Sequence, residues 1–233
     1  QIADELLRSG RRVFLSIGPH ARPPRRYRGK DFVWWLGVLG KWALKTPPQG
    51  RAHVTIAVSG AHGGETVDFR RFAARGMTLL GMTARHDGGV MHFADDLARN
   101  IMAGDDNYLG LLDEADAYVA ANGIDLPEDP AARLLGSDPE CMTRPVRSLD
   151  LATEGVSTII WATGYKQDFD WLKLACFHGD GRPQHKEGIA EVPGLYFLGL
   201  PWLSMRGSSF IWGVWEDAAR LAGDIAARHG TAP

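Results

Sequence analysis

Cysteine is scarce in this sequence, which contains only Cys141 and Cys176 among 233 residues. Two cysteines so far apart exclude a disulfide framework and a Cys-x-x-Cys redox or zinc motif. We therefore expect a reducing, cytoplasmic environment. The histidines also lack the spacing typical of metal ligands, so we expect no metal site.

Long apolar runs are absent as well. The longest uncharged apolar stretch, residues 192–205, contains two prolines and is shorter than the roughly 20 residues that a membrane-spanning helix needs. No segment resembles a signal peptide. The formal net charge of -2 gives the whole chain no attraction to nucleic acid or to an anionic membrane. We therefore expect neither as a partner, and any cationic function has to come from a local patch.

The apolar pattern predicts a globular α/β protein. Val13–Ile17 follows a short helix and is closed by Gly18-Pro19, as expected for a strand buried on both faces of a parallel sheet. Further strands are predicted at 53–58, 77–82, 156–161 and 195–200, and helices at 1–9, 32–42, 67–74 and 209–227. Two more helices are predicted in an insertion at about 92–122. We expect its clustered acids to face solvent, namely Asp95, Asp96, Asp105, Asp106, Asp113, Glu114 and Asp116.

A basic loop follows the first predicted strand. Between Glu5 and Asp31 there is no acidic residue, but there are basic ones at Arg8, Arg11, Arg12, Arg22, Arg25, Arg26, Arg28 and Lys30. In a dinucleotide-binding fold this strand end meets the adenosine ribose, where a carboxylate selects NAD and an arginine accommodates the 2′-phosphate of NADP. The strand ends here without a carboxylate, so we expect NADP. The expected ligands are Ser16, Arg22, Arg25 and Arg26, with Arg22 and Arg25 foremost. A solvated loop or a nucleic-acid patch would give the same pattern.

Two further segments with glycine at a strand end are candidate cofactor contacts. In residues 159–165, Gly164 lets a nucleotide approach the backbone closely, and Thr163 can hydrogen-bond across the turn. Residues 193–200 precede Ser208-Ser209 and the last predicted helix, whose free amides and positive dipole end suit a pyrophosphate or a flavin edge. Ordinary core strands would explain both patterns without a ligand.

Four segments occur in a familiar order: Gln1–Leu6, Arg25–Asp31, Ala162–Tyr165 and Gly194–Gly199. Together they resemble bacterial flavin-dependent monooxygenases, which are similar to the flavin-containing monooxygenases and include members labelled as flavoproteins involved in K⁺ transport. The resemblance covers nearly the whole chain. It implies a three-layer fold with two dinucleotide-binding domains, in which an NADPH domain interrupts an FAD domain.

The resemblance implies that residues 1–158 are the later part of the NADPH domain and that residues 159–233 return to the FAD domain. The FAD contacts it implies are Ala162, Thr163, Gly164, Tyr165, Gly199, Leu200, Ser208 and Ser209. The two Gly-x-Gly-x-x-Gly turns of the family are absent, so we expect the chain to lack its N-terminal part and to hold FAD weakly. Leu200 also departs from the pattern, because many related flavoproteins have an Asp there.

The activity that the resemblance implies is cofactor chemistry. NADPH reduces FAD by hydride transfer, O2 forms a hydroperoxyflavin, and one oxygen atom passes to a small organic substrate, while the protein orients the rings and excludes water. No catalytic side chain is assigned. Two alternatives stay open: an NADPH-dependent flavin reductase or oxidase that transfers no oxygen, and a non-catalytic regulatory flavoprotein linked to ion transport. The sequence defines neither the substrate nor the oligomeric state.

Overall fold

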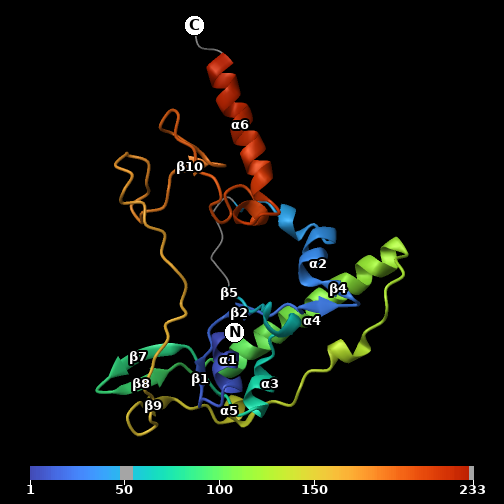
Figure 1. Ribbon diagram of the computed structural model, residues 1–233, viewed down its shortest axis with the longest axis vertical. Coiled ribbons are helices and arrows are strands. Elements are labelled where there is room, and N and C mark those ends of the chain that lie inside the picture. Colours follow the sequence, from blue (N-terminus) through green and yellow to red (C-terminus); the bar gives the residue numbers. More distant parts are fainter. Residues whose placement is uncertain (48–54, 231–233) are drawn as a thin grey trace. The chain divides into compact units, whose positions relative to one another are not determined.

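The computed structural model describes residues 1–47 and 55–230. It shows a mixed α/β protein whose short strands form several small sheets (Figure 1). The chain divides into two compact units. The first unit consists of Gln1–Trp35 and His53–Ile160, and the second of Leu36–Ala52 and Trp161–Pro233.

Two pairs of parallel strands underlie the first unit. The pairs are β1 (Phe14–Ser16) with β6 (Thr78–Leu80), and β2 (His20–Ala21) with β5 (Thr55–Ile56). Helix α1 (Ile2–Arg8) directly precedes β1, and α3 (Phe69–Ala74) directly precedes β6. Parallel strands need such crossover connections. The prediction of a parallel strand after the first helix is therefore confirmed, but its burial on both faces is not, because Phe14 and Leu15 are half-buried and Ser16 is exposed. The core around these strands is formed by Val13, Ile17, Val67, Phe69, Met77, Leu79, Leu97 and Ile101.

The first unit also contains a three-stranded antiparallel sheet. Its members are β7 (Thr83–Asp87), β8 (Val90–Phe93) and β9 (Ser148–Asp150). Gly88 and Gly89 join β7 to β8 with φ angles of +54° and +86°, the left-handed conformation that tight two-residue hairpins favour. The sequence pattern did not predict this sheet, because four of the five residues of β7 are exposed.

A single long helix, α4 (Leu97–Asn122), stands where two helices were predicted. Its buried stripe continues through Leu97, Ile101, Tyr108, Leu112, Ala115 and Val119. Glycine inside a helix costs only about 1 kcal/mol relative to alanine, so Gly104 and Gly110 do not break a helix that buries so much apolar surface. Gly123, with φ +58°, ends it.

Short elements complete the first unit. They are the hairpin of β3 (Arg26–Tyr27) and β4 (Lys30–Asp31), the start of α2 (Phe32–Val38), α5 (Glu140–Thr143), and the 3-10 turns Ala61–Gly63 and Pro130–Arg133. The β3–β4 hairpin lies beside α4 (Figure 1), to which the Tyr27 hydroxyl and Asp116 connect it.

The second unit consists mainly of loops and one helix. Its elements are α6 (Val214–Gly230), the hairpin of β10 (His185–Lys186) and β11 (Ile189–Ala190), and the 3-10 turns Lys41–Ala43 and Arg206–Ser209. Cys176, Ala190, Phe197 and Leu203 form its core. The strand-like segment around Lys45 bridges to Met205, and the Thr46 hydroxyl donates to the carbonyl of Trp202 at 2.7 Å.

Two predicted strands and one predicted helix start are wrong. Residues 156–161 and 195–200 form no strand in the described part of the chain, apart from an isolated bridge at Tyr196. A strand requires a neighbour to satisfy its backbone groups. Within the described residues, 156–161 pairs with no strand. Residues 195–200 have a neighbour only around Tyr196, where the Phe197 N–H donates to the Gly188 carbonyl and the Leu195 carbonyl accepts from Ala190. Helix α6 begins at Val214 rather than at Ser209, because the serines before it belong to a separate 3-10 turn.

Across residues 1–47 and 55–230, no helix combines the length and the apolar character needed to cross a membrane. Within the same ranges, no group of three His, Cys, Asp or Glu side chains is placed to hold a metal ion.

Candidate functional site

The basic loop of residues 19–30 lies along α4. The backbone N–H of Arg22 donates to the side-chain oxygen of Asn107 at 3.0 Å. Farther along the helix, the Tyr27 hydroxyl and the Arg28 guanidinium both bind Asp116, at 2.9 Å and 2.7 Å. With a rise of 1.5 Å per residue, the two anchoring points on α4 lie roughly 14 Å apart. The arginines are therefore spread along a helix rather than gathered at one strand end.

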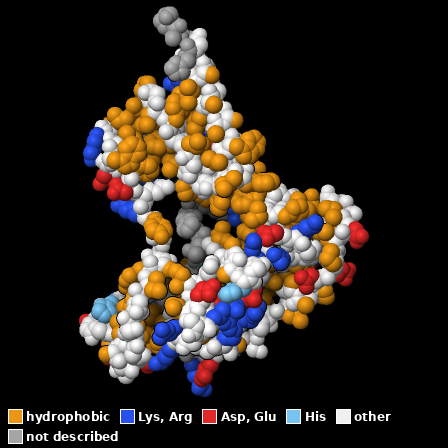
Figure 2. All heavy atoms as spheres, in the orientation of Figure 1, with side chains coloured by type: hydrophobic (Ala, Val, Ile, Leu, Met, Phe, Trp, Pro, Cys, Tyr) orange, Lys and Arg blue, Asp and Glu red, His pale blue; other side chains and the backbone are white. Residues whose placement is uncertain are grey.

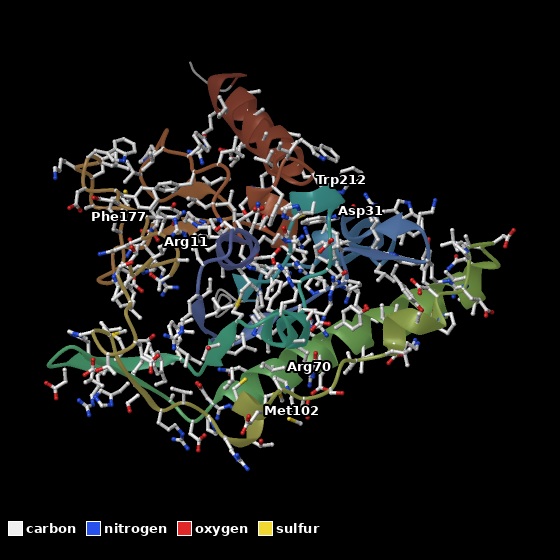
Figure 3. All side chains as sticks on the ribbon, turned by 60° about the horizontal axis from the view of Figure 1, so that its bottom comes forward. Arg11, Asp31, Arg70, Met102, Phe177 and Trp212 are labelled. Atoms are coloured by element: carbon white, nitrogen blue, oxygen red, sulfur yellow. The ribbon has the colours of Figure 1, made fainter. Side chains whose placement is uncertain are left out.

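A buried ion-pair cluster holds the start of this loop. Asp105 on α4 accepts hydrogen bonds from Arg22, at 2.6 Å, and from Arg70 on α3. The side chains of Arg22, Asp105 and Arg70 are only 4%, 6% and 8% exposed. Figure 3 shows Arg70 beside α4. Our expectation that the acids of this region face solvent is wrong for Asp105 and for Asp96, which are both buried. Asp105 is buried because a buried guanidinium requires a buried counter-charge. Asp96 accepts the backbone N–H of Met82 at 2.9 Å.

Arg22 follows β2 directly and is held on three sides. Besides Asp105, its guanidinium donates to the carbonyl of Val67 at 3.2 Å and lies 4.4 Å from the centre of the Tyr108 ring. This position, just beyond the carboxyl end of a parallel strand, is where α/β folds bind ligands.

Asp116 forms a second, more accessible cluster. It pairs with Arg28 and with Arg133, both at 2.7 Å, and accepts from Tyr27. Burial alone would raise the pKa of Asp116, but the hydrogen bonds from Arg133, Arg28 and Tyr27 outweigh it and lower that pKa. Burial and the Asp116 contact raise the pKa of Tyr27 to about 12. Three other acids of α4 are exposed as expected: Asp106, Asp113 and Glu114.

Arg25 and Arg26 differ in their burial and in their interactions with the rest of the chain. Arg25 pairs with Asp31 at 2.8 Å, and its Nε is buried without a hydrogen-bond partner among the described residues. It packs on Gly64, where a Cβ would come within 3.1 Å of the Arg25 Cγ. Arg26 is exposed, and its side chain has no ion pair or hydrogen bond within residues 1–47 and 55–230.

Ser16 occupies the carboxyl end of β1. Its hydroxyl donates to the carbonyl of Gly81 at 2.9 Å and accepts from the backbone N–H of Thr83 at 3.1 Å. Ser16 therefore ties the ends of β1 and β6 to β7, and its exposed side remains open to a ligand.

A hollow of about 150 Å³ opens next to Arg22. We call it the Arg22 hollow. Its lining includes Arg22, Thr66, Asp68, Arg71, Tyr108 and Leu134. Its walls come from Arg22 directly after β2, from residues 66–71 at the start of α3, from α4 and from residues 131–135. Only Arg22 links the hollow to the carboxyl end of a parallel strand, β2.

His20 on β2 is buried beside this cluster. Its Nδ1–H donates to the carbonyl of Gly18 at 3.0 Å, and its Nε2 has no partner among the described residues. Its ring packs edge-on against Phe69 and directly against Gly104 of α4. Burial lowers the pKa of His20 below its ordinary value of 6.5, with the nearby Arg22 charge acting in the same direction and Asp105 opposing it.

We expect His20 to make the folded chain less stable as the pH falls. The unfolded chain takes up a proton near pH 6.5, whereas the folded chain resists protonation until a lower pH. The free energy of unfolding should therefore decrease from about pH 7 downward, by at most about 1.4 kcal/mol per pH unit from this group, and level off below the folded pKa.

Urea unfolding at pH 7.0 and pH 5.5 measures this effect. In the variant His20→Leu, the decrease in the free energy of unfolding that comes from His20 should be absent. The decrease that comes from protonation of carboxylates at lower pH should remain. Equal decreases in the parent and the variant would show that His20 does not contribute.

The residues predicted to contact FAD do not share one site in the second unit. Ala162, Thr163, Gly164 and Tyr165 are exposed in an extended segment, and Gly199 is exposed with φ +78°. Leu200 packs against the core of this unit. Ser208 is completely buried, and its Oγ accepts the backbone N–H groups of Ser204 and Met205, both at 3.1 Å. Ser209 is exposed beside it.

Asp217 fixes the turn before α6. It accepts from the Ser204 hydroxyl and pairs with Arg220 at 2.8 Å. Burial alone would raise the pKa of Asp217, but the hydrogen bonds from Ser204, Ser208 and Arg220 lower it. Three large hydrophobic residues between this turn and Asp217 are exposed: Ile211, Trp212 and Trp215. Figure 2 shows hydrophobic side chains over much of the surface of this unit.

Three curated proteins are similar to part of the chain. An uncharacterized oxidoreductase CzcO-like from Geobacillus kaustophilus is 46% identical over 71 residues, which are 30% of this chain and 20% of that protein. Proteins named uncharacterized oxidoreductase CzcO from Bacillus velezensis and Bacillus subtilis are 44% and 43% identical over 70 residues, with the same coverage. No family model and no solved structure matches the chain.

Part of this chain is thus similar to proteins named as oxidoreductases. The match spans about one fifth of the length of these relatives. The names of these relatives specify no cofactor or substrate.

Sequence reasoning missed Asp105 and Arg70 as partners of the basic loop. Asp105 lies 83 residues from Arg22, so no local pattern links them. One signal was available: Asp105 stands in the buried helical stripe of α4, between Ile101 and Tyr108. A carboxylate in an apolar stripe indicates a buried cationic partner.

Proposed function

We propose that this chain is part of an NADPH- and FAD-dependent monooxygenase that oxygenates a small organic molecule, and that the first unit binds NADPH. The observation that carries the proposal is the similarity to oxidoreductases, combined with arginines beyond the carboxyl ends of parallel strands. In doubly wound α/β folds, dinucleotides bind at that edge of the sheet.

The residues of the first unit suit a nicotinamide nucleotide with a 2′-phosphate. No carboxylate follows β1 or β2 where a ribose with a free 2′-hydroxyl would need one. Ser16 would contact the ribose side of the ligand, and Arg25 and Arg26 would bind the phosphate. The buried Nε of Arg25, which lacks a partner among the described residues, supports this role, because such a donor gains from a ligand oxygen.

The second unit has few residues that are available to bind a flavin. Ser208 is already engaged by backbone amides, and residues 162–165 are exposed in an extended segment. These residues therefore do not by themselves form a flavin cradle, and we assign no step to them. When bound, FAD would supply the redox chemistry, accepting hydride from NADPH and activating O2.

Replacing Arg25 and Arg26 together with glutamine should weaken NADPH binding about 10-fold and leave NADH binding unchanged, because the loss of charge-assisted hydrogen bonds affects only the extra phosphate. Titration calorimetry of the chain with NADPH and with NADH measures both affinities.

The control is Arg85→Gln on β7, an exposed arginine outside the loop. It removes one positive charge without touching the parallel strands. An unchanged affinity ratio in the double variant, or an equal loss in the control, would refute the assignment of the loop to the phosphate.

A further inference from the structure

The β10–β11 hairpin of the second unit turns through two residues in the left-handed conformation. Glu187 and Gly188 have φ angles of +48° and +91°, which is the combination that tight two-residue hairpin turns favour. Glycine adopts this conformation freely, but a residue with a Cβ, such as Glu187, does so at a cost in energy. The turn therefore depends on contacts from outside it to stay closed.

Gly188 is enclosed by the core of the second unit. A Cβ at this position would lie 2.5 Å from the Phe197 carbonyl oxygen and 3.0 Å from the Leu203 side chain. The Gly188 carbonyl accepts the Phe197 N–H at 2.7 Å. Because Gly188 is buried, its own N–H also needs a partner within the protein.

The partner of the Gly188 N–H is the imidazole of His185. The N–H donates to His185 Nδ1 at 3.1 Å. An imidazole nitrogen accepts a hydrogen bond only while it carries no proton, so His185 is neutral in the closed turn and has its proton on Nε2. Protonation of Nδ1 would place two N–H donors against each other and remove this hydrogen bond.

A second contact holds the turn from α6. The Arg220 guanidinium donates to the carbonyl of Glu187, and its Nε lies 3.7 Å from the Glu187 carboxylate. Arginine stays protonated throughout the range in which histidine titrates. Of these two contacts, the one made by His185 is therefore the one that changes near neutral pH.

The surroundings of His185 oppose its protonation. Burial lowers the pKa of His185 below its ordinary value of 6.5, the nearby His178 acts in the same direction, and Asp217 of α6 opposes both. The Phe197 ring packs beside the imidazole, with ring centroids 5.9 Å apart. Burial alone would raise the pKa of Asp217, but its hydrogen bonds lower it, so this carboxylate stays charged while His185 titrates. The imidazole is therefore neutral at pH 7 and becomes charged on acidification.

We propose that the β10–β11 turn is a pH-sensitive switch, closed while His185 is neutral and released when its imidazole is protonated. Release frees the Gly188 N–H and weakens the attachment of the turn to Phe197. It also loosens the hold of Arg220 on Glu187, which connects the hairpin to α6. The switch consists of residues of the second unit alone and does not depend on the proposed function.

Amide hydrogen exchange of the whole chain, followed by ¹H–¹⁵N NMR from pH 7.5 to pH 4.5, tests the switch. The intrinsic pH dependence of exchange is first divided out. The protection of the Gly188 amide should then fall about 5- to 10-fold at the acidic end, because one of the hydrogen bonds that hold the turn is lost. The midpoint of this fall should coincide with the titration of the His185 imidazole in the same samples.

His185→Asn keeps an acceptor oxygen close to the position of Nδ1 but does not titrate in this range. The protection of Gly188 should therefore stay constant with pH in this variant. The matched control is His178→Asn, which removes a neighbouring imidazole and leaves the acceptor of the Gly188 N–H in place. The fall in protection should persist there and move to a slightly higher pH.

Three results would overturn the inference. One is constant protection of Gly188 across the whole pH range in the parent chain. Another is an equal fall in His185→Asn, which would show that protonation elsewhere opens the turn. The third is loss of the fall in His178→Asn, which would make His178 the group that responds to pH.

Discussion

Asp105→Asn is expected to lower the free energy of unfolding by about 3–5 kcal/mol, because it leaves two buried guanidiniums without their shared counter-charge. Asp105 receives hydrogen bonds from Arg22 and Arg70 and is almost completely buried. Asparagine keeps the shape of the side chain but replaces one acceptor oxygen with a donor NH2 group facing an arginine. The loss therefore combines an uncompensated charge with an unfavourable contact.

Urea unfolding followed by far-ultraviolet circular dichroism measures this loss. Asp106→Asn is the matched control: the same substitution one residue along α4, at an exposed position with no ion pair among the described residues. It should change stability by no more than about 0.5 kcal/mol. A loss below about 1 kcal/mol for Asp105→Asn would contradict a structural role for the cluster.

Gly104→Ala should also destabilise the chain, by about 1–3 kcal/mol, because a methyl group there would overlap the buried His20 ring. A Cβ at this position would lie 3.0 Å from the His20 Cδ2 and closer still to its Nε2. The ring cannot move away easily, because Phe69 packs against it with ring centroids 4.8 Å apart. Helix α4 would have to shift away from β2.

Gly110→Ala on the same helix provides the comparison. A Cβ at Gly110 would have no neighbouring atom within 4 Å. This variant should gain about 0.5–1 kcal/mol from the higher helix propensity of alanine. A loss of stability in Gly104→Ala together with a gain in Gly110→Ala would confirm the close packing of α4 on β2. A gain of stability in both variants would exclude it.

The sequence predicted the α/β class, the first parallel strand and the helices before β1 and β6. These elements bury residues in a regular period, so their own side chains reveal them. It failed for residues 156–161, whose apolar run is typical of a buried strand, because a strand also needs neighbours that a local pattern does not show. It also predicted two helices where a continuous buried stripe sustains one, α4.

The candidate site was less predictable than the fold. The run of arginines was plain in the sequence, but their partners were not, because Asp105 and Asp116 lie 83 and 88 residues away from Arg22 and Arg28. Three of the expected ligands thus have different surroundings: Arg22 is buried and paired, Arg25 is paired on one side, and Arg26 is exposed. Their roles toward a nucleotide stay predictions.

The bond between Thr46 and Trp202 has a consequence for biosynthesis. It joins two segments of the second unit that lie 156 residues apart in the sequence, with most of the first unit between them. The entropic cost of closing a loop rises with its length. During translation the segment around Thr46 leaves the ribosome long before its partner exists. The first unit can therefore fold before the segment around Thr46 pairs with Trp202. The second unit can complete its fold only when the last turn before α6 has been synthesised.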